Sequence, residues 1–288
     1  MSTFAGPIDP ATTVGAVRLR VADLDASRSF YEDVLGLETL ESSSSEARLG
    51  AGGSPLVELA AAPEAPLRPL RSTGLFHLAL LVPDRPRLAI ALRRLARRGW
   101  RLTGASDHLV SEALYLNDPE GNGIEIYRDR PREQWHWEDG TVEMDTLPLN
   151  LEDVLGESAD DDDDAMAPET RMGHVHLTVA DIPDADAFYS GLLGFKPTVR
   201  GYPGALFVAA GGYHHHLGLN TWAGAGAPAP PPGSRGLEHF EVILPSDDAL
   251  EALGGRLERG GARPERDRDG GLALADPFAN RILVRVAG

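Results

Sequence analysis

The stretch SDHLVSEALYLNDPEGNGIEIY, from Ser106 to Tyr127, decides the fold of this chain. Its middle, NDPEGNG (Asn117–Gly123), gathers the residue types that supply the fixed and positive backbone angles of tight turns. We therefore predict a strand, a turn and a second strand that spans Ile124–Tyr127. Because side chains alternate along a strand, Glu125 lies on one face and the two isoleucines lie on the other. The isoleucines suit a core, and Glu125 becomes a carboxylate carried on a rigid strand.

The first arm of this hairpin carries two more groups that can take part in chemistry, His108 and Tyr115. A carboxylate, an imidazole and a phenol on one hairpin suit metal binding and proton transfer. The alternative is an ordinary β-hairpin with scattered polar side chains. This stretch alone favours neither interpretation.

Three segments of the first half of the chain return in the second half. VRLRVADLD from Val17 returns as VHLTVADIP from Val175, and HLALLVP from His77 returns as HFEVILP from His239. The turn segment DPEGNGI also returns, as DPFANRI. Self-similarity of this kind indicates a duplicated architecture, so we predict two homologous halves.

Each half divides again into two units of the pattern strand, amphipathic helix and several short strands. Leucines at helical spacing predict the helices of the second and fourth units, and Gly99 and the pair Gly260-Gly261 end them. The predicted fold is α+β, with four βαβββ units that form two paired, cup-shaped mixed sheets. We predict a first pair of units over residues 13–130, an acidic linker over 131–171 and a second pair over 172–288.

The composition narrows the class of protein. The 288 residues are 42% hydrophobic and 25% charged, as in soluble globular proteins, and no apolar run approaches the roughly 20 residues of a membrane helix. There is no cysteine, which excludes disulfides, Fe–S clusters and thiol nucleophiles. Together with the absence of a signal-peptide pattern, this predicts a cytoplasmic protein that does not bind membranes. The net charge of −17, part of it in the run Asp160–Asp164, excludes nucleic acid as a partner.

At this point the repeats resemble a known superfamily. The segments FYEDVLGL (Phe30–Leu37) and FYSGLLGF (Phe188–Phe195), with the HLALLV strand and the DPEGNGIE hairpin, resemble the vicinal oxygen chelate superfamily of glyoxalases, bleomycin-resistance proteins and extradiol dioxygenases. The segment GGYHHHLGLNTW (Gly211–Trp222) is similar to the two-domain bacterial catechol-2,3-dioxygenases. The resemblance covers nearly the whole chain except the linker.

The resemblance implies that two βαβββ units pair into a cup around a divalent metal ion. The first-strand ligand positions of the four units hold Ala16, His77, His174 and His239, and the last-strand positions of the second and fourth units hold Glu125 and Leu283. Pairing of the second and third units would bring together His77, Glu125 and His174. The cup of the first and fourth units would then lack a complete ligand set and stay empty.

Two histidines and one carboxylate leave neighbouring coordination positions open, as in non-haem iron oxygenases. The resemblance therefore implies Fe(II) or Mn(II), with a small aromatic diol and O₂ as substrates. It places Tyr115 and His108 in proton transfer, and it favours His215 as the acid/base residue. Strand alternation puts His214 and His216 on one face and His215 on the other, so His216 fits that role equally well.

Two other functions remain open at this stage. A glyoxalase-type isomerase or lyase would use Ni(II) or Zn(II), with His216 as a fourth ligand. A small-molecule-binding resistance protein would hold no metal. His176 shares a face with His174 and either lines the cup or fills it. We expect His239 to be a relic of the duplication or a hydrogen-bonded core histidine rather than a ligand. The superfamily also implies a homo-oligomer.

Overall fold

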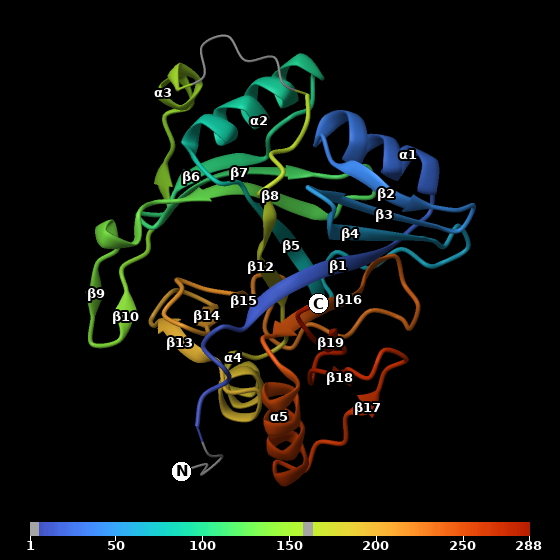
Figure 1. Cartoon of the computed structure of the whole chain (residues 1–288), viewed down its shortest axis with the longest axis vertical. Helices are drawn as coiled ribbons and strands as arrows, with labels where there is room; N and C mark the ends of the chain where they lie inside the picture. Colours follow the sequence, from blue (N-terminus) through green and yellow to red (C-terminus); the bar gives the residue numbers. More distant parts are fainter. Residues whose placement is uncertain (1–5, 158–163) are drawn as a thin grey trace. The chain divides into compact units, whose positions relative to one another are not determined.

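The computed structural model describes residues 6–157 and 164–288 of the chain (Figure 1). Of the predicted acidic run, only Asp164 falls within these residues. The chain forms two compact units, which we call the early unit (residues 18–65 and 77–173) and the late unit (residues 1–17, 66–76 and 174–288). Three strands run from one unit into the other: β1 (Thr13–Val21), β5 (Gly74–Leu81) and β12 (Arg171–Thr178). The predicted division at the linker stays a prediction.

The early unit contains two repeats of the predicted pattern. The first consists of the end of β1, α1 (Leu24–Ser29) with a π-helical turn (Phe30–Val34), β2 (Glu38–Ser42), β3 (Glu46–Ala51) and β4 (Ser54–Ala61). The second consists of β5, α2 (Arg85–Arg97), β6 (Gly104–Asp107), β7 (Ser111–Asn117) and β8 (Gly123–Asp129). In the second repeat β6, β7 and β8 are antiparallel neighbours, whereas β5 lies parallel to β8. The predicted hairpin is therefore β7 and β8.

The late unit contains two further repeats with the same parallel first and last strands. The third consists of β12, α4 (Ile182–Asp186) with a π-helical turn (Ala187–Leu192), β13 (Lys196–Val199), β14 (Ala205–Ala209) and β15 (Leu217–Asn220). The fourth consists of β16 (Gly236–Leu244), α5 (Asp247–Arg259), β17 (Glu265–Arg266), β18 (Leu272–Ala275) and β19 (Arg281–Val286). β12 pairs in parallel with β15, and β16 pairs in parallel with β19. These repeats confirm the predicted α+β fold.

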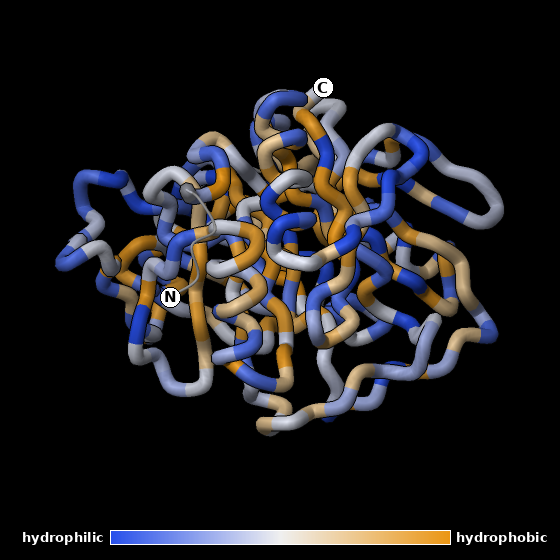
Figure 2. Tube along the Cα trace, turned by 90° about the horizontal axis from the view of Figure 1, so that it is seen from below, coloured by the Kyte–Doolittle hydropathy of each residue, from blue (hydrophilic) through white to orange (hydrophobic). Residues whose placement is uncertain are grey.

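The two long helices pack as their leucine spacing predicts. The buried leucines of the stripes are Leu88, Leu92 and Leu95 on α2 and Leu250, Leu253 and Leu257 on α5. Asp84 and Ser246 cap the first turns by accepting backbone N–H bonds, and Gly99, at φ +66°, follows the end of α2. Figure 2 shows the hydrophobic segments gathered in the interior and hydrophilic segments at outlying loops. Among the described residues, none of the helices combines the length and apolar character needed to cross a membrane.

The linker after β8 is packed against the early unit. It forms a 3-10 turn (Arg132–Gln134), β9 (Trp137–Glu138), β10 (Thr141–Val142), β11 (Leu147–Pro148) and α3 (Leu151–Gly156). β11 pairs antiparallel with β6, and Arg85 of α2 bonds Asp153 at 2.6 Å and Glu157 at 2.8 Å. The described part of the linker is therefore bound to the second repeat by strand pairing and ion pairs.

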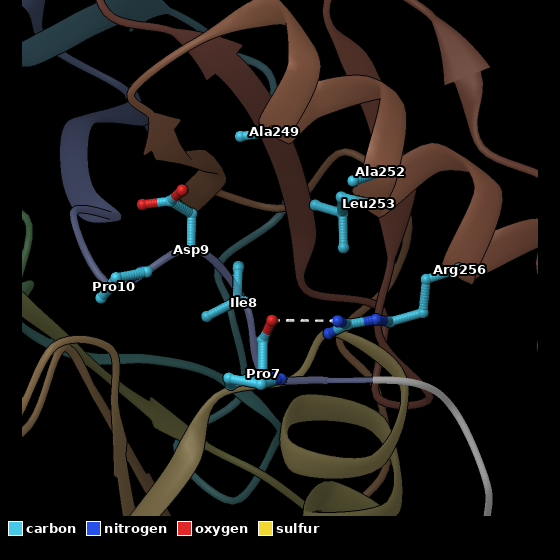
Figure 3. Close-up of a pocket in the computed structure, with 8 residues that line it drawn as sticks. All are labelled: Pro7, Ile8, Asp9, Pro10, Ala249, Ala252, Leu253 and Arg256. Atoms are coloured by element: carbon cyan, nitrogen blue, oxygen red, sulfur yellow. Dashed lines mark hydrogen bonds between the residues drawn. The ribbon is translucent and has the colours of Figure 1, made fainter.

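Each long helix carries a buried arginine whose guanidinium donates hydrogen bonds to backbone carbonyls distant in the sequence. Arg94 of α2 donates to the carbonyls of Leu35 at 2.6 Å and Ala165 at 3.1 Å. Arg256 of α5 does the same in the late unit, where its guanidinium donates to the Leu193 carbonyl at 3.0 Å. It also donates to the Pro7 carbonyl at 3.0 Å (Figure 3). A cavity of about 270 Å³ lies beside Arg256, lined mainly by apolar side chains. We therefore regard it as a packing feature.

The repeated DP-x-x-N turn is tied to the preceding repeat by a buried tyrosine. In the early unit the Tyr31 hydroxyl donates to Asp118 at 3.1 Å, and the Asn122 side chain donates to the same carboxylate oxygen at 2.8 Å. In the late unit Tyr189 donates to Asp276 at 2.8 Å. Burial raises the pKa of both carboxyl groups, which makes their hydrogen-bond donors essential.

We expect Tyr31→Phe and Tyr189→Phe each to lower the free energy of unfolding by about 1–3 kcal/mol, because each leaves a buried carboxylate short of one donor. Urea unfolding followed by far-UV circular dichroism measures this loss. Because the two bonds lie in separate units, the two variants test the same prediction independently of one another. Losses below about 0.3 kcal/mol in both would contradict this account of the turns.

Candidate metal and proton-transfer site

The best candidate site in the early unit is a buried histidine–glutamate pair on neighbouring strands. In the parallel register of β5 and β8, Ala79 is opposite Glu125, so Glu125 shares a sheet face with His77, two residues before Ala79. The His77 Nε2 and Glu125 Oε2 atoms are 3.0 Å apart, and the residues are only 6% and 2% exposed. A nitrogen and a carboxylate oxygen that converge in a buried place fit two ligands of one divalent ion.

Small side chains make room on this face of the sheet. Ala79, Leu81, Ala113 and Tyr127 form a buried cluster, and Tyr115 packs against it. In the register of β7 and β8, Tyr115 is opposite Glu125, and its ring centroid is 5.7 Å from that of His77. The structure therefore brings three of the predicted site residues together, one each from β5, β7 and β8.

His108, also predicted for the site, is hydrogen-bonded on both ring nitrogens. Its Nε2 is 2.7 Å from the Tyr115 hydroxyl, and its Nδ1 is 2.7 Å from the backbone oxygen of Asp145 in the linker. Because a carbonyl oxygen can only accept, Nδ1 carries the proton. In the neutral ring Nε2 is then the acceptor for the Tyr115 O–H. Sequence reasoning missed Asp145, since a backbone carbonyl leaves no mark in the side-chain pattern.

The turn beside His108 is held by a charged residue. Leu109 adopts φ +69°, and its amide donates to Asp107 at 2.9 Å. Burial works to raise the pKa of Asp107, but the bonds from Leu109 and Arg130 more than offset it and hold the pKa below its usual value. Asp107 therefore stays ionised near neutral pH and holds the turn at Leu109 through the backbone amide.

In the late unit, His174 lies on β12 next to another predicted residue. The His174 and His215 ring centroids are 4.1 Å apart, and the Nδ1 atoms of His215 and His214 are 2.7 Å apart. All three histidines are buried. One of the two Nδ1 atoms must donate and the other accept, so this bond orders the His215 ring.

The prediction that Tyr213–His216 lies in a strand is wrong, because β15 begins only at Leu217. Gly211 and Gly212 have φ of +60° and +71°, so the chain turns before the histidines and side-chain alternation does not apply. His216 accepts the Ala210 amide on Nδ1 at 3.2 Å and packs against Tyr213. His215, rather than His216, is the histidine whose ring contacts that of His174, at a tilt of 52°.

The corresponding positions of the fourth repeat hold different chemistry. His239 is half-buried, and Leu283 stands opposite Glu241 in the register of β16 and β19. The Glu241 carboxylate accepts the Ala16 amide at 3.1 Å and pairs with Arg285 at 3.2 Å. An arginine-paired carboxylate is already neutralised, which makes it a poorer metal ligand. The empty second cup stays a prediction.

Comparisons with known proteins agree with this architecture. The family described as the Glyoxalase/Bleomycin resistance protein/Dioxygenase superfamily matches residues 13–126 and again residues 171–284. The chain is 41% identical over 280 residues to a catechol-2,3-dioxygenase of Bacillus subtilis (strain 168), which covers 96% of this chain and 97% of that protein.

Two solved structures show the same fold at low identity. A protein of Bacillus subtilis subsp. subtilis str. 168, provisionally described as a dioxygenase, has a TM-score of 0.66 at 12% identity over 98% of this chain and 86% of that chain. Glyoxalase I from Zea mays has a TM-score of 0.59 at 15% identity over 95% and 92%. The chain belongs to the Glyoxalase/Bleomycin resistance protein/Dioxygenase superfamily and is an enzyme related to its dioxygenases.

Proposed function

We propose that this chain is an extradiol dioxygenase that opens a catechol-type ring with O₂, at a divalent metal ion held by His77, Glu125 and His174. The buried His77–Glu125 pair, with its 3.0 Å separation, is the observation that carries the proposal. The near-full-length likeness to a catechol-2,3-dioxygenase supports the reaction class. Within either compact unit taken alone, the described residues contain no group of three ligand-type side chains able to hold one ion, and we propose the third ligand separately.

His174 is the third ligand of choice. It is buried and offers one ligand nitrogen. It directly follows Gly173, which packs so closely on the Tyr127 ring in the early unit that an added methyl group would collide with the hydroxyl. Tyr127 lies two residues beyond Glu125 on the same face of β8. Chain continuity from Gly173 therefore favours His174 as a partner of Glu125.

The start of β5 gives a second argument of the same kind. In the late unit the Phe76 ring lies 5.1 Å from the ring of His176, two residues after His174 on β12. His77 directly follows Phe76 in the chain. Gly173, which precedes His174, therefore packs on β8, and Phe76, which precedes His77, packs on β12.

The donor set favours Fe(II), with Mn(II) as the alternative, because two imidazoles and one carboxylate suit these ions and leave positions open. When bound, the ion would supply the Lewis-acid and electron-transfer chemistry that joins the diol to O₂. Every other task falls to the protein's own side chains.

Tyr115 and His108 form a path for a catechol proton. The Tyr115 oxygen can accept the proton of the diol while its own O–H passes to the His108 Nε2, 2.7 Å away. The Asp145 carbonyl selects the tautomer of the neutral His108 ring that carries its proton on Nδ1, and Nε2 is then the acceptor. The linker thereby contributes a backbone atom to the proposed site.

His215 is the proposed acid/base residue on the late-unit side. Its Nδ1 pairs with His214, and we assign proton exchange with the substrate to its Nε2. Its ring lies 4.1 Å from the His174 ring, between centroids, and the residue is only 5% exposed, which places a proton carrier beside a proposed ligand and away from bulk water. His216 remains the second choice, and in a glyoxalase-type isomerase with Ni(II) or Zn(II) it would serve as a fourth ligand.

We expect the purified protein, reconstituted anaerobically, to bind one equivalent of Fe(II). His77→Ala, Glu125→Gln and His174→Ala should each weaken binding by at least about 100-fold, because even the loss of an outer-sphere partner costs roughly 10–100-fold. His239→Ala is the matched control and should bind as the unchanged protein does. Elemental analysis and a chelator competition measure these affinities.

The metal assignment fails if His174→Ala keeps its iron while His239→Ala loses it. Absence of stoichiometric metal from all the proteins, with no ring opening after Fe(II) addition, would instead favour a small-molecule-binding protein.

Tyr115→Phe should lower kcat for catechol by about 10²–10⁴-fold with little change in KM, because it removes the proton path but no ligand. The assay follows the yellow ring-opened product in air. Tyr189→Phe, which alters a buried hydroxyl outside the site, serves as the control and should keep its kcat below its unfolding temperature. Unchanged turnover by Tyr115→Phe would remove this role.

A further inference from the structure

The late unit carries a row of aromatic side chains that the proposed reaction does not use. In the register of β12, β15 and β14, His176 and Phe207 are both opposite Gly218, so the three share one face of the sheet. His174 lies two residues before His176 and projects to the same face. The row therefore begins on the surface that carries a proposed metal ligand.

Gly218 is what allows the two rings to meet across its strand. A Cβ built on Gly218 would come within 2.8 to 3.0 Å of the His176 ring atoms. With glycine there, the His176 and Phe207 ring centroids lie 5.7 Å apart in an edge-to-face arrangement. A larger residue at position 218 would force the His176 ring to move, so the contact between these two rings depends on Gly218.

The row extends outward to two exposed rings. The Trp222 centroid is 5.4 Å from that of His176, Phe76 is 5.2 Å from Trp222, and Tyr202 is 5.6 Å from Phe207. Trp222 and Phe76 are 48% and 42% exposed. Trp222 is nevertheless held, since its Nε1 donates to the Pro203 carbonyl at 3.1 Å. Fixed and exposed aromatic rings in contact with one another are typical of a binding surface.

The row is also continuous inward to the proposed site. Phe207 lies 5.0 Å from His215, and His215 lies 4.1 Å from His174. Ring contacts thus run without a break from a proposed metal ligand to the solvent-exposed edge of Trp222. The row consists of histidine, phenylalanine, tyrosine and tryptophan rings and contains no carboxylate, lysine or arginine. It therefore suits an uncharged aromatic group.

We propose that this row is a second subsite that receives a flat, uncharged aromatic substituent, so that the preferred substrate is an aryl-substituted catechol rather than catechol itself. The inference rests on the proposed function, because it presumes that the diol end of the substrate binds beside His174. The substituent lies against the exposed rings of Trp222 and Phe76, and Tyr202 borders it. The buried rings of His176 and Phe207 lie behind them.

The test compares catechol with a phenyl-substituted catechol as ligands. The full chain is loaded with Zn(II), which has no redox chemistry, so that both diols bind without turnover. Titration calorimetry then gives the two dissociation constants. We expect the phenylcatechol to bind about tenfold more tightly or better, a ratio that corresponds to the contribution of one or two aromatic contacts.

Variants of Trp222 test whether the row of aromatic rings causes the tighter binding of the phenylcatechol. Trp222→Ala should reduce the preference to about twofold or less, whereas Trp222→Phe keeps a ring and should retain most of it. Trp137→Ala removes a 37% exposed tryptophan from β9 of the early unit and should leave the preference unchanged. Circular dichroism confirms that each variant is folded.

The subsite is ruled out if the unchanged protein binds the two diols with equal affinity. It is also ruled out if Trp222→Ala and Trp137→Ala reduce the preference for the phenylcatechol equally. If the iron-loaded protein still cleaves catechol in either of these cases, only the subsite is lost and the proposed function stands. If neither diol binds the loaded protein, the dioxygenase proposal fails, and the subsite fails with it.

Discussion

The structure depends on one costly arrangement, a carboxylate and an imidazole buried together on neighbouring strands. Glu125 is 2% exposed and His77 is 6% exposed, with 3.0 Å between their nearest nitrogen and oxygen atoms. Burying such a pair costs several kcal/mol unless a third charged or polar partner joins it. The alanines beside the pair, the tyrosine opposite it and the linker that holds His108 all make sense as supports for a buried cation.

The duplication allows the proposed ligand positions to be compared between the two halves of the chain. The buried tyrosine–aspartate bond survives in both halves, at Tyr31 and at Tyr189, because every repeat pair must anchor the same turn. The ligand positions are under no such structural demand. Glu125 has become Leu283 in the second half, where an arginine-paired glutamate now occupies the sheet. The tyrosine–aspartate contact is thus present in both halves, and the glutamate of the proposed ligand set in only one.

Most of the fold could be predicted from the sequence, because leucine spacing and repeated turns report directly on local structure. The residues of the hairpin site could also be predicted, since Glu125 and Tyr115 face one another across adjacent strands. The histidine run was harder to interpret. Two glycines with positive φ take the chain out of the strand before His214, and alternation then assigns the wrong faces. The Asp145 carbonyl and the aromatic row depend on tertiary contacts that no local pattern encodes.

The central claim is that one ion has two imidazole nitrogens and one carboxylate in its protein coordination shell. Pulsed electron paramagnetic resonance of the Mn(II)-loaded protein tests it most directly, because each coordinated imidazole gives a resolvable nitrogen coupling. The account predicts two such couplings, one of which disappears in His174→Ala and the other in His77→Ala. Identical spectra for His174→Ala and the unchanged protein would contradict it.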